Sequence, residues 1–233
     1  MISQESEFEF INRGFKDTIV LVPGWATDYR VFSTLSLNYN YIATKKLNPF
    51  DFSDRFLQAL SRESIERVSL FGWSLGAFLA VEFALNNSER VNQVILSGIR
   101  ERYETAALEG IKQKIIKNKK AYLIKFYHDC FSDSRKVSLM WFKKHLLKDY
   151  LDAIRVEDLI LGLEYLSKAK IDAESLRFLK KIRIFHGLED KIAPVNEARQ
   201  MKRLLPGIKF IFVPDSGHAV FLSSGFKERL ENG

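Results

Sequence analysis

Short runs of apolar, mostly β-branched residues recur along this chain and are separated by polar segments. A run of this kind that ends in Pro, Gly or polar residues is typical of a buried strand that leads into a loop. We predict strands in six such runs, at residues 17–25, 40–47, 66–72, 91–98, 181–187 and 208–218. These runs predict a central sheet.

Helical spacing appears between several of the predicted strands. Segment 51–63 places Phe56, Leu57 and Leu60 on one face, and segment 75–87 favours a helix because it lacks Gly and Pro after its second residue. A further helix is predicted in the closing segment, 223–233. Alternating strands and helices indicate the α/β class, with a mostly parallel central sheet and helices on both faces.

The alternation stops between residues 101 and 176, where the chain is rich in lysine, helical in period and without a convincing strand. We predict that segment 101–176 is a helical cap inserted into a single domain, whose core comprises residues 1–100 and 177–233. The cap's large apolar residues are expected to pack it onto the core, and some to line an acyl pocket. They are Tyr122, Leu123, Phe126, Tyr127, Phe131, Met140, Trp141, Phe142, Leu146 and Leu147.

The composition limits the class of protein and the cellular compartment that we expect for this chain. The 233 residues are 46% hydrophobic, which is enough for one sizeable core. The N-terminal stretch MISQESEFEF lacks the apolar region of a secretory signal, and no apolar run is long enough to span a membrane. The chain holds a single cysteine, Cys130, and no Cys/His spacing typical of a metal site. We therefore expect a cytoplasmic monomer without metal, cofactor or membrane contact.

The net charge of +7 comes from one stretch of the chain. The segment from Lys112 to Lys148 contains eleven Lys and Arg residues but only two acids, Asp129 and Asp133. Such a stretch is typical of a solvated helix face, and it also suits an acidic partner. No nucleic-acid-binding motif accompanies it, so nucleic acid is not an expected partner.

The stretch FGWSLGAF sets Ser74 between Gly72 and Gly76, which is the G-x-S-x-G spacing of a nucleophile elbow. A serine nucleophile needs a base, and the base needs an acid that orients it. Asp190 and His218 follow two of the predicted strands in the order serine, acid, histidine. This order predicts a catalytic triad, and the alternative is that Ser74 is an ordinary turn serine.

Two other acids compete with Asp190 for the role in the triad. Glu189 is adjacent to it, and Asp215 is nearer to His218 in the sequence. The G-x-x-D spacing from Gly187 favours Asp190. Among the remaining histidines, His186 is interpreted as structural, and two in the cap are expected at the surface, namely His128 and His145.

Backbone N–H groups are expected to stabilise the oxyanion of an acyl-transfer reaction. One belongs to Leu75, which follows the serine, and the other to Trp25 in PGWATD. Trp25 and Trp73 flank the proposed nucleophile, either as packing or as walls of a substrate channel. The candidate pocket residues are Trp25, Trp73, Phe126 and Trp141.

The segments VPGWATDYRVF, FGWSLGAF, FHGLEDKIAP and DSGHAVFLS together resemble the α/β-hydrolase superfamily, over residues 17–225. Two features, GW in the first segment and GWSLG in the second, are similar to the pimeloyl-acyl-carrier-protein methyl ester esterases of biotin synthesis. Two departures stand out. Pro23 replaces the histidine usual in the oxyanion loop, and the family's D-x-x-G-x-G-x-S loop is missing, with KLNPFDFSD in its place.

The resemblance implies hydrolysis of the methyl ester of pimeloyl-acyl carrier protein through an acyl-enzyme. It also implies that the acidic carrier protein docks on the basic cap, for which our candidates are Lys143, Lys144 and Lys148. Two alternatives stay open. One is a general carboxylesterase or thioesterase acting on small free acyl substrates, and the other is a catalytically silent hydrolase scaffold that only binds.

Overall fold

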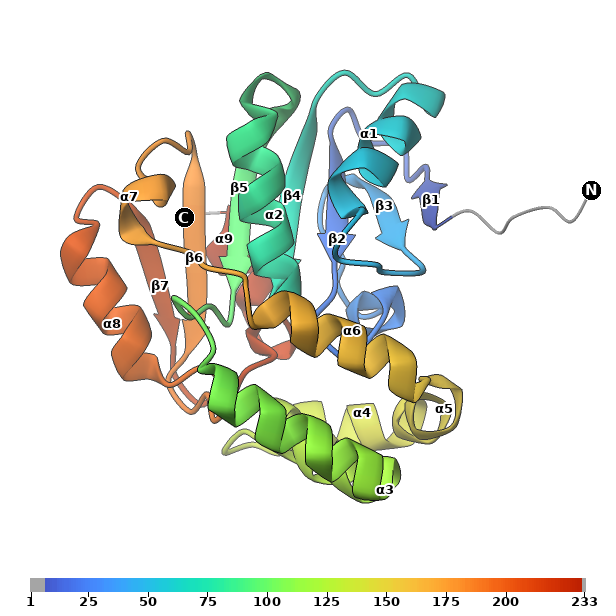
Figure 1. Cartoon of the computed structure of the whole chain (residues 1–233). Helices are drawn as coiled ribbons and strands as arrows, with labels where there is room; N and C mark the ends of the chain where they lie inside the picture. The colour runs from blue at the N-terminus through green and yellow to red at the C-terminus, as the bar shows by residue number, and fades with distance from the viewer. Residues whose placement is uncertain (1–6, 232–233) are drawn as a thin grey trace, which may run out of the picture.

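A computed structural model describes residues 7–231, which form one seven-stranded sheet (Figure 1). The strands are β1 (Phe8–Ile11), β2 (Thr18–Val22), β3 (Asn40–Thr44), β4 (Val68–Trp73), β5 (Val91–Ser97), β6 (Ile182–Gly187) and β7 (Lys209–Val213). They lie in the order β1-β3-β2-β4-β5-β6-β7. β1 pairs antiparallel with β3, and the remaining neighbours pair in parallel. The predicted mostly parallel sheet is confirmed.

Two layers cover the sheet. One contains α1 (Phe52–Arg62), α2 (Leu75–Asn86) and α8 (Val195–Leu204), and the other contains the 3-10 helices η1 (Tyr29–Phe32) and η3 (Val220–Leu222) with α9 (Phe226–Glu231). A short 3-10 helix, η2 (Ser88–Arg90), precedes β5. Phe56 of α1 meets Phe83 of α2 on the first side, with 4.9 Å between ring centroids. Phe71 of β4 packs against aromatic rings of the second layer, namely Phe32, Phe221 and Phe226.

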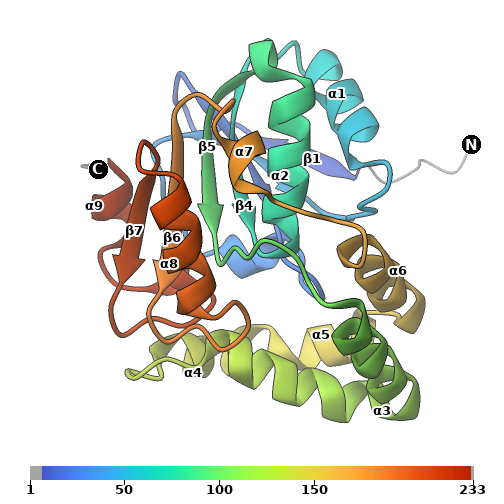
Figure 2. The same ribbon diagram turned by 60° about the vertical axis from the view of Figure 1, so that its left-hand side comes forward.

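The chain between β5 and β6 is helical. It forms α3 (Thr105–Phe131), α4 (Val137–His145), α5 (Leu147–Ala153), α6 (Val156–Leu166) and α7 (Ala173–Leu176). Figures 1 and 2 place α3 to α6 together beyond the carboxyl ends of the strands, where the arrowheads point. We keep the name cap for residues 101–176. Because functional loops of parallel sheets gather at the carboxyl ends, the cap faces the edge that carries them.

Aromatic side chains give the cap its own core. Phe131 of α3 stacks on Phe142 of α4 with 4.0 Å between ring centroids, and Tyr127 lies 4.8 Å from the same ring. Tyr150 of α5 closes the cluster. The expectation that Met140 packs inward is wrong. Its side chain lies on the outer face of α4 and is 69% exposed.

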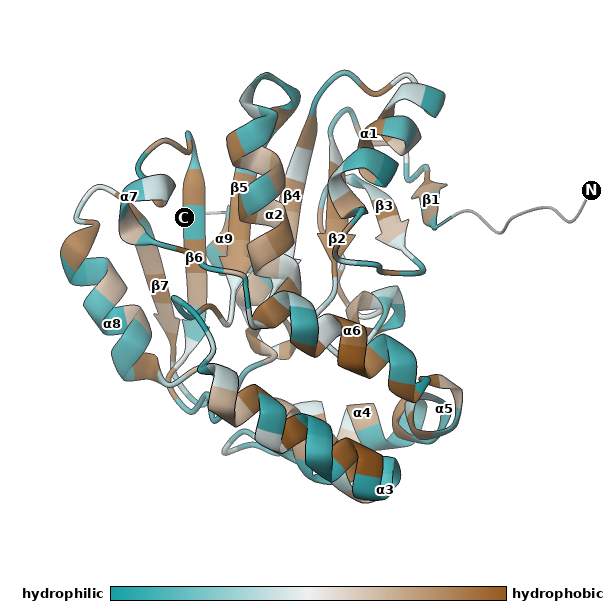
Figure 3. Cartoon of the chain, viewed as in Figure 1, coloured by the Kyte–Doolittle hydropathy of each residue, from teal (hydrophilic) through white to brown (hydrophobic). Residues whose placement is uncertain are grey.

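The longest helix, α3, is interrupted at Asn118, whose backbone torsions are φ −160° and ψ 90°. Lysines alternate with apolar residues along it, as the mixed colours of Figure 3 show. Within residues 7–231, no helix combines the length and the apolar character needed to cross a membrane. Part of the N-terminal stretch that we inspected for a signal, residues 1–6, lies outside the described residues, as do residues 232–233 of the closing segment.

Candidate active site

Ser74 occupies a sharp turn between β4 and α2. Its backbone lies in the left-handed region, with φ 55° and ψ −117°, which is a strained conformation for a residue with a side chain. The turn needs small neighbours. A Cβ on Gly72 would lie 2.5 Å from the carbonyl oxygen of Gly76, and one on Gly76 would lie 2.6 Å from that of Pro23. The two glycines therefore let strand and helix meet closely enough to form the elbow.

Asp190 lies in the loop after β6 and holds His218. Its Oδ2 accepts a hydrogen bond of 2.7 Å from Nδ1 of His218, and its Oδ1 accepts two of 2.8 Å from the N–H groups of Ile192 and Ala193. Both the aspartate and the histidine side chains are fully buried. Burial by itself would raise the pKa of Asp190, but the charge and hydrogen bond of His218, with help from His186 and Ala193, lower that pKa below its ordinary value.

Both the main chain and the ring of His218 have close neighbours. The indole N–H of Trp73, the neighbour of Ser74, donates to the carbonyl of His218 at 3.0 Å. A Cβ on Gly98 would lie 2.8 Å from the imidazole, so the ring packs directly against this glycine. Within residues 7–231, Nε2 of His218 is buried without a hydrogen-bond partner. The ring thus carries one nitrogen fixed on a carboxylate and one buried nitrogen that is unbonded.

The two rival acids are used elsewhere. Glu189 accepts hydrogen bonds from the backbone N–H of Ser134, at 2.8 Å, and from its hydroxyl. Asp215 accepts from Arg135 at 3.2 Å. Both donors belong to the cap, so these acids fasten the cap to the loops that follow β6 and β7. Asp190 is the one of the three that contacts His218.

The other histidines have different surroundings. The ring of His186 is fully buried, its Nε2 donates to the carbonyl of Ala193 at 2.8 Å, and it lies 3.6 Å from Oδ2 of Asp190. Burial lowers the pKa of His186 even though the charge of Asp190 opposes this. His186 therefore supports the loop that carries Asp190. The two cap histidines, His128 and His145, are exposed.

The two expected oxyanion donors lie beside the serine. Leu75 is the first residue of α2, so its N–H is outside the hydrogen bonds of the helix itself. A Cβ on Gly24 would lie 3.1 Å from Cβ of Ser74, which places the loop of Trp25 against the nucleophile. The indole N–H of Trp25 donates to the carbonyl of Leu159 in α6 at 2.9 Å. Trp25 therefore joins this loop to the cap.

The candidate pocket residues fall into three environments. Trp25 meets Phe126 of α3 edge to face, with 4.8 Å between ring centroids. Trp73 is 1% exposed and packs against Phe131 and Phe221, so it supports the site from behind. Trp141 is half-buried on α4, and its ring contact is with His145. The structure thus brings Trp25 and Phe126 together and leaves Trp141 apart from them.

Two residues at the site were missed by the sequence analysis. The side chain of Tyr103 lies near enough to Ser74 for the serine to oppose the rise in the pKa of the phenol that burial causes, and the guanidinium of Arg100 lies over the tyrosine ring, 4.7 Å from its centroid. Both follow β5 at its carboxyl end. That position was the available signal, but these residues belong to no motif and lie at the boundary between the core and the cap.

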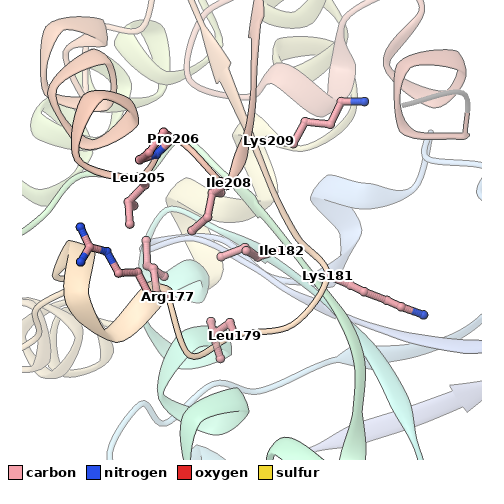
Figure 4. Close-up of a pocket in the computed structure, with 10 residues that line it drawn as sticks. Arg177, Leu179, Lys181, Ile182, Leu205, Pro206, Ile208 and Lys209 are labelled. Carbon is pink, nitrogen blue, oxygen red and sulfur yellow. The ribbon is translucent and has the colours of Figure 1, made fainter.

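A cavity of about 460 Å³ lies at the other end of the sheet, at the amino ends of β6 and β7. Figure 4 shows apolar side chains gathered there, among them Ile182, Leu205 and Ile208, while Lys181 and Lys209 point away from them. The residues described above around Ser74 come from the carboxyl ends of the strands. This cavity is therefore separate from the candidate site.

Metal-binding side chains do not cluster in the part of the chain that the structure describes. No three His, Cys, Asp or Glu residues among residues 7–231 are arranged to hold a metal ion. The free cysteine, Cys130, is buried, and burial raises the pKa of its thiol well above the ordinary value. This thiol therefore stays protonated at neutral pH.

Curated relatives share one name. A pimeloyl-[acyl-carrier protein] methyl ester esterase of Nitrosomonas europaea is 26% identical over 187 residues, covering 74% of this chain and 73% of that protein. The protein of the same name from Aliivibrio salmonicida is 23% identical over 230 residues, covering 88% of this chain and 86% of its own.

Solved structures show the same fold. An esterase from Exiguobacterium antarcticum superposes with a TM-score of 0.80 at 18% identity, and a bromoperoxidase from Bacillus anthracis with 0.79 at 18% identity. Each comparison covers 97% of this chain and 93% of the other. The model of the alpha/beta hydrolase fold family matches residues 21–224, which is most of the chain. This protein therefore belongs to the alpha/beta hydrolase fold family.

Proposed function

We propose that this protein is a serine carboxylesterase that works through an acyl-enzyme, and that its substrate is the methyl ester of pimeloyl-acyl carrier protein. One observation carries the proposal. His218 is buried, with Nδ1 bonded to the carboxylate of Asp190 and Nε2 unbonded, and it contacts Trp73, the residue that precedes Ser74 at the strained elbow. Membership of the hydrolase family and the esterase relatives support the same activity.

In the proposed reaction, Nε2 of His218 takes the hydroxyl proton of Ser74 as the serine oxygen attacks the ester carbonyl. The N–H groups of Leu75 and Trp25 stabilise the negative charge on the carbonyl oxygen. The alkoxy oxygen then leaves with the proton that His218 holds, and a water molecule hydrolyses the acyl-enzyme by the same route. Asp190 orients the imidazole and stabilises its positive form.

The carrier-bound substrate is supported by the names of the relatives and by the charge of the cap. Lys143 and Lys144 lie in the last turn of α4 and are exposed. Lys148 is 90% exposed and lies 3.4 Å from Asp152. A basic surface next to the site would steer an acidic carrier protein toward it.

Hydrolysis assays on purified variants test the reaction. Ser74→Ala should lower kcat by about 10⁴-fold or more, because it removes the nucleophile and leaves only binding and the oxyanion donors. Asp190→Asn should lower kcat by roughly 10³-fold or more, since the imidazole loses its orienting charge. Glu189→Gln is the matched control and should keep most of the activity, because that acid contacts the cap.

The substrate is tested by comparing methyl-pimeloyl-acyl carrier protein with a free p-nitrophenyl ester. Serine-dependent cleavage with a strong preference for the carrier-bound ester supports the full proposal. Cleavage of the free ester alone would leave a general carboxylesterase. A folded wild-type protein whose Ser74 is not labelled by a fluorophosphonate would contradict the enzymatic proposal and favour a binding scaffold.

A further inference from the structure

The proposed oxyanion loop, which we take as residues 24–28, is bonded to the cap at three points. The indole described above is the first of them. The hydroxyl of Tyr127 in α3 donates to the carbonyl of Ala26 at 2.6 Å. The hydroxyl of Tyr150 in α5 donates to Oδ1 of Asp28 at 2.8 Å. Three helices of the cap therefore contact one short loop of the core.

Ala26 has an unusual backbone conformation. Its φ is 59°, in the left-handed region that a residue with a side chain rarely adopts, and among residues 24–28 it is the one with a positive φ. An alanine that is free to relax prefers a negative φ, and such a change would turn the peptide units on both sides of it. The surrounding structure must therefore hold this residue in its strained conformation.

Tyr127 is placed to hold it. The tyrosine is 1% exposed, and its ring packs in the aromatic core of the cap, 4.8 Å from that of Phe142 and 5.9 Å from that of Tyr150. Burial raises the pKa of the phenol well above its ordinary value, so the hydroxyl keeps its proton at neutral pH. Because a buried hydroxyl that loses its hydrogen bond is costly, this donor fixes the carbonyl of Ala26.

The fixed carbonyl lies close to the proposed chemistry along the chain. One peptide unit separates it from the N–H of Trp25, and Gly24 on the far side of that N–H packs against Ser74. We propose that Tyr127 is a positioning residue, whose hydroxyl keeps Ala26 in the left-handed region and thereby aims the N–H of Trp25 at the oxyanion. This inference rests on the proposed ester hydrolysis, in which Trp25 supplies that donor.

The first test is steady-state kinetics on a short-chain p-nitrophenyl ester. The oxyanion forms only as the serine attacks, so a donor that is aimed wrongly lowers kcat and leaves substrate binding in place. Tyr127→Phe should lower kcat about tenfold or more and change KM less than about twofold. The phenylalanine ring keeps the aromatic contacts of the cap core.

A second readout does not depend on turnover. When Ser74 adds to a short-chain trifluoromethyl ketone, His218 takes the hydroxyl proton and the ketone oxygen becomes an oxyanion at the same donors. The inhibition constant of this ketone should rise about tenfold in Tyr127→Phe, in step with the loss in kcat. A hydroxyl that only stabilised the cap would leave that constant unchanged, and this result would overturn the inference.

The strained residue also offers a rescue. Glycine adopts a φ of 59° without the steric cost that alanine has, so it should depend less on the hydroxyl. Adding Ala26→Gly to Tyr127→Phe should raise kcat at least about threefold above that of Tyr127→Phe alone. In the wild type, Ala26→Gly should change kcat by less than about threefold. An absence of rescue would show that Tyr127 does not act through the backbone of Ala26.

Tyr165→Phe is the matched control. Its hydroxyl also joins the cap to the core, where it donates to Glu82 of α2 at 2.8 Å, but it does not bond to the oxyanion loop. This variant should keep kcat and the inhibition constant within about twofold of the wild type. Thermal unfolding checks that each variant folds. Loss of the folded state in Tyr127→Phe would overturn the inference, because the hydroxyl would then be needed by the cap itself.

Labelling separates this inference from the proposed function. If a fluorophosphonate labels Ser74 in the wild type and Tyr127→Phe keeps the wild-type kcat, or changes KM alone, the role of Tyr127 is wrong and the esterase stands. If the wild type is neither labelled nor active on the ester, the proposed function fails and this inference fails with it.

Discussion

At Asp190, burial and hydrogen bonding act in opposite directions. Removal from water favours the neutral carboxyl group, while His218 and two backbone N–H groups favour the charged one. The lowered pKa shows that the partners prevail. A carboxylate that stays charged without contact with water is suited to orienting an imidazole, and it couples the candidate site to the stability of the fold.

The first prediction follows from this coupling. Because folding lowers the pKa of Asp190, its contribution to stability is fully present above the ordinary aspartate pKa of about 3.9 and is lost as the pH falls through the lower folded value. The stability advantage of the wild type over Asp190→Asn should therefore be largest near pH 7 and shrink below about pH 4. Urea unfolding of both proteins across this range measures it, and a constant difference would contradict it.

Among the single residues of the candidate site, Asp190 could be predicted from the sequence and Tyr103 could not. The G-x-x-D spacing picks out the acid that contacts His218, because a short loop after a strand places its residues reproducibly. Nothing local distinguishes Tyr103, whose position near Ser74 brings together residues that are remote in the sequence. Such a contact depends on the path of the chain into the cap, which no motif specifies.

At the scale of elements, two glycines inside cap helices have opposite surroundings. Gly110 lies in α3, and a Cβ there would meet nothing within 4 Å. Gly162 lies in α6, and a Cβ there would lie 2.5 Å from Cδ1 of Trp25. The first glycine only weakens its helix, while the second provides the space in which the indole packs.

The second prediction compares these positions. Gly110→Ala should stabilise the protein by about 0.5–1 kcal/mol, since alanine loses less conformational entropy in a helix. Gly162→Ala should destabilise it by roughly 1–3 kcal/mol, because the added methyl group displaces the indole. Chemical denaturation measures both changes. Stabilisation by Gly162→Ala would show that α6 and Trp25 can separate without cost.

The strands and helices of the core were largely predictable, because burial on both faces imposes long apolar runs. β1 was not predictable, since Phe8–Ile11 is a short edge strand whose apolar residues are interrupted by a charged one. α8 was not predicted either, because its buried face is narrow, with Ala198 and Met201 as its buried residues. The break in α3 at Asn118 has no apolar signal, and the outward position of Met140 depends on how α4 packs.

At the scale of the whole molecule, the candidate docking lysines and two exposed apolar side chains lie in the same part of the cap. The candidate docking residues lie at the end of α4 and in α5, beyond the carboxyl ends of the strands. Exposed apolar side chains, Val137 and Met140, lie on the same helix α4. A partner with acidic and apolar groups would find both kinds of contact here.

The third prediction reverses these charges. Combining Lys143→Glu, Lys144→Glu and Lys148→Glu should raise KM for a carrier-bound ester about tenfold or more and weaken its dependence on salt, while a free ester should change little. Steady-state kinetics at several salt concentrations measures this. The matched control changes the same total charge at the amino edge of the sheet, with Lys16→Glu, Lys180→Glu and Arg203→Glu. An equal effect of both variants, or an equal loss on both substrates, would contradict docking on the cap.

The hydrogen bond from the Trp25 indole to Leu159 has a consequence for how such an enzyme can diversify. The main chain of this residue belongs to the proposed oxyanion loop, and its side chain is anchored in the cap. A cap exchanged for that of a relative would keep this anchor only if it placed a main-chain carbonyl where that of Leu159 lies. Selectivity, which depends on the cap, and turnover, which depends on the oxyanion loop, are therefore linked through one tryptophan.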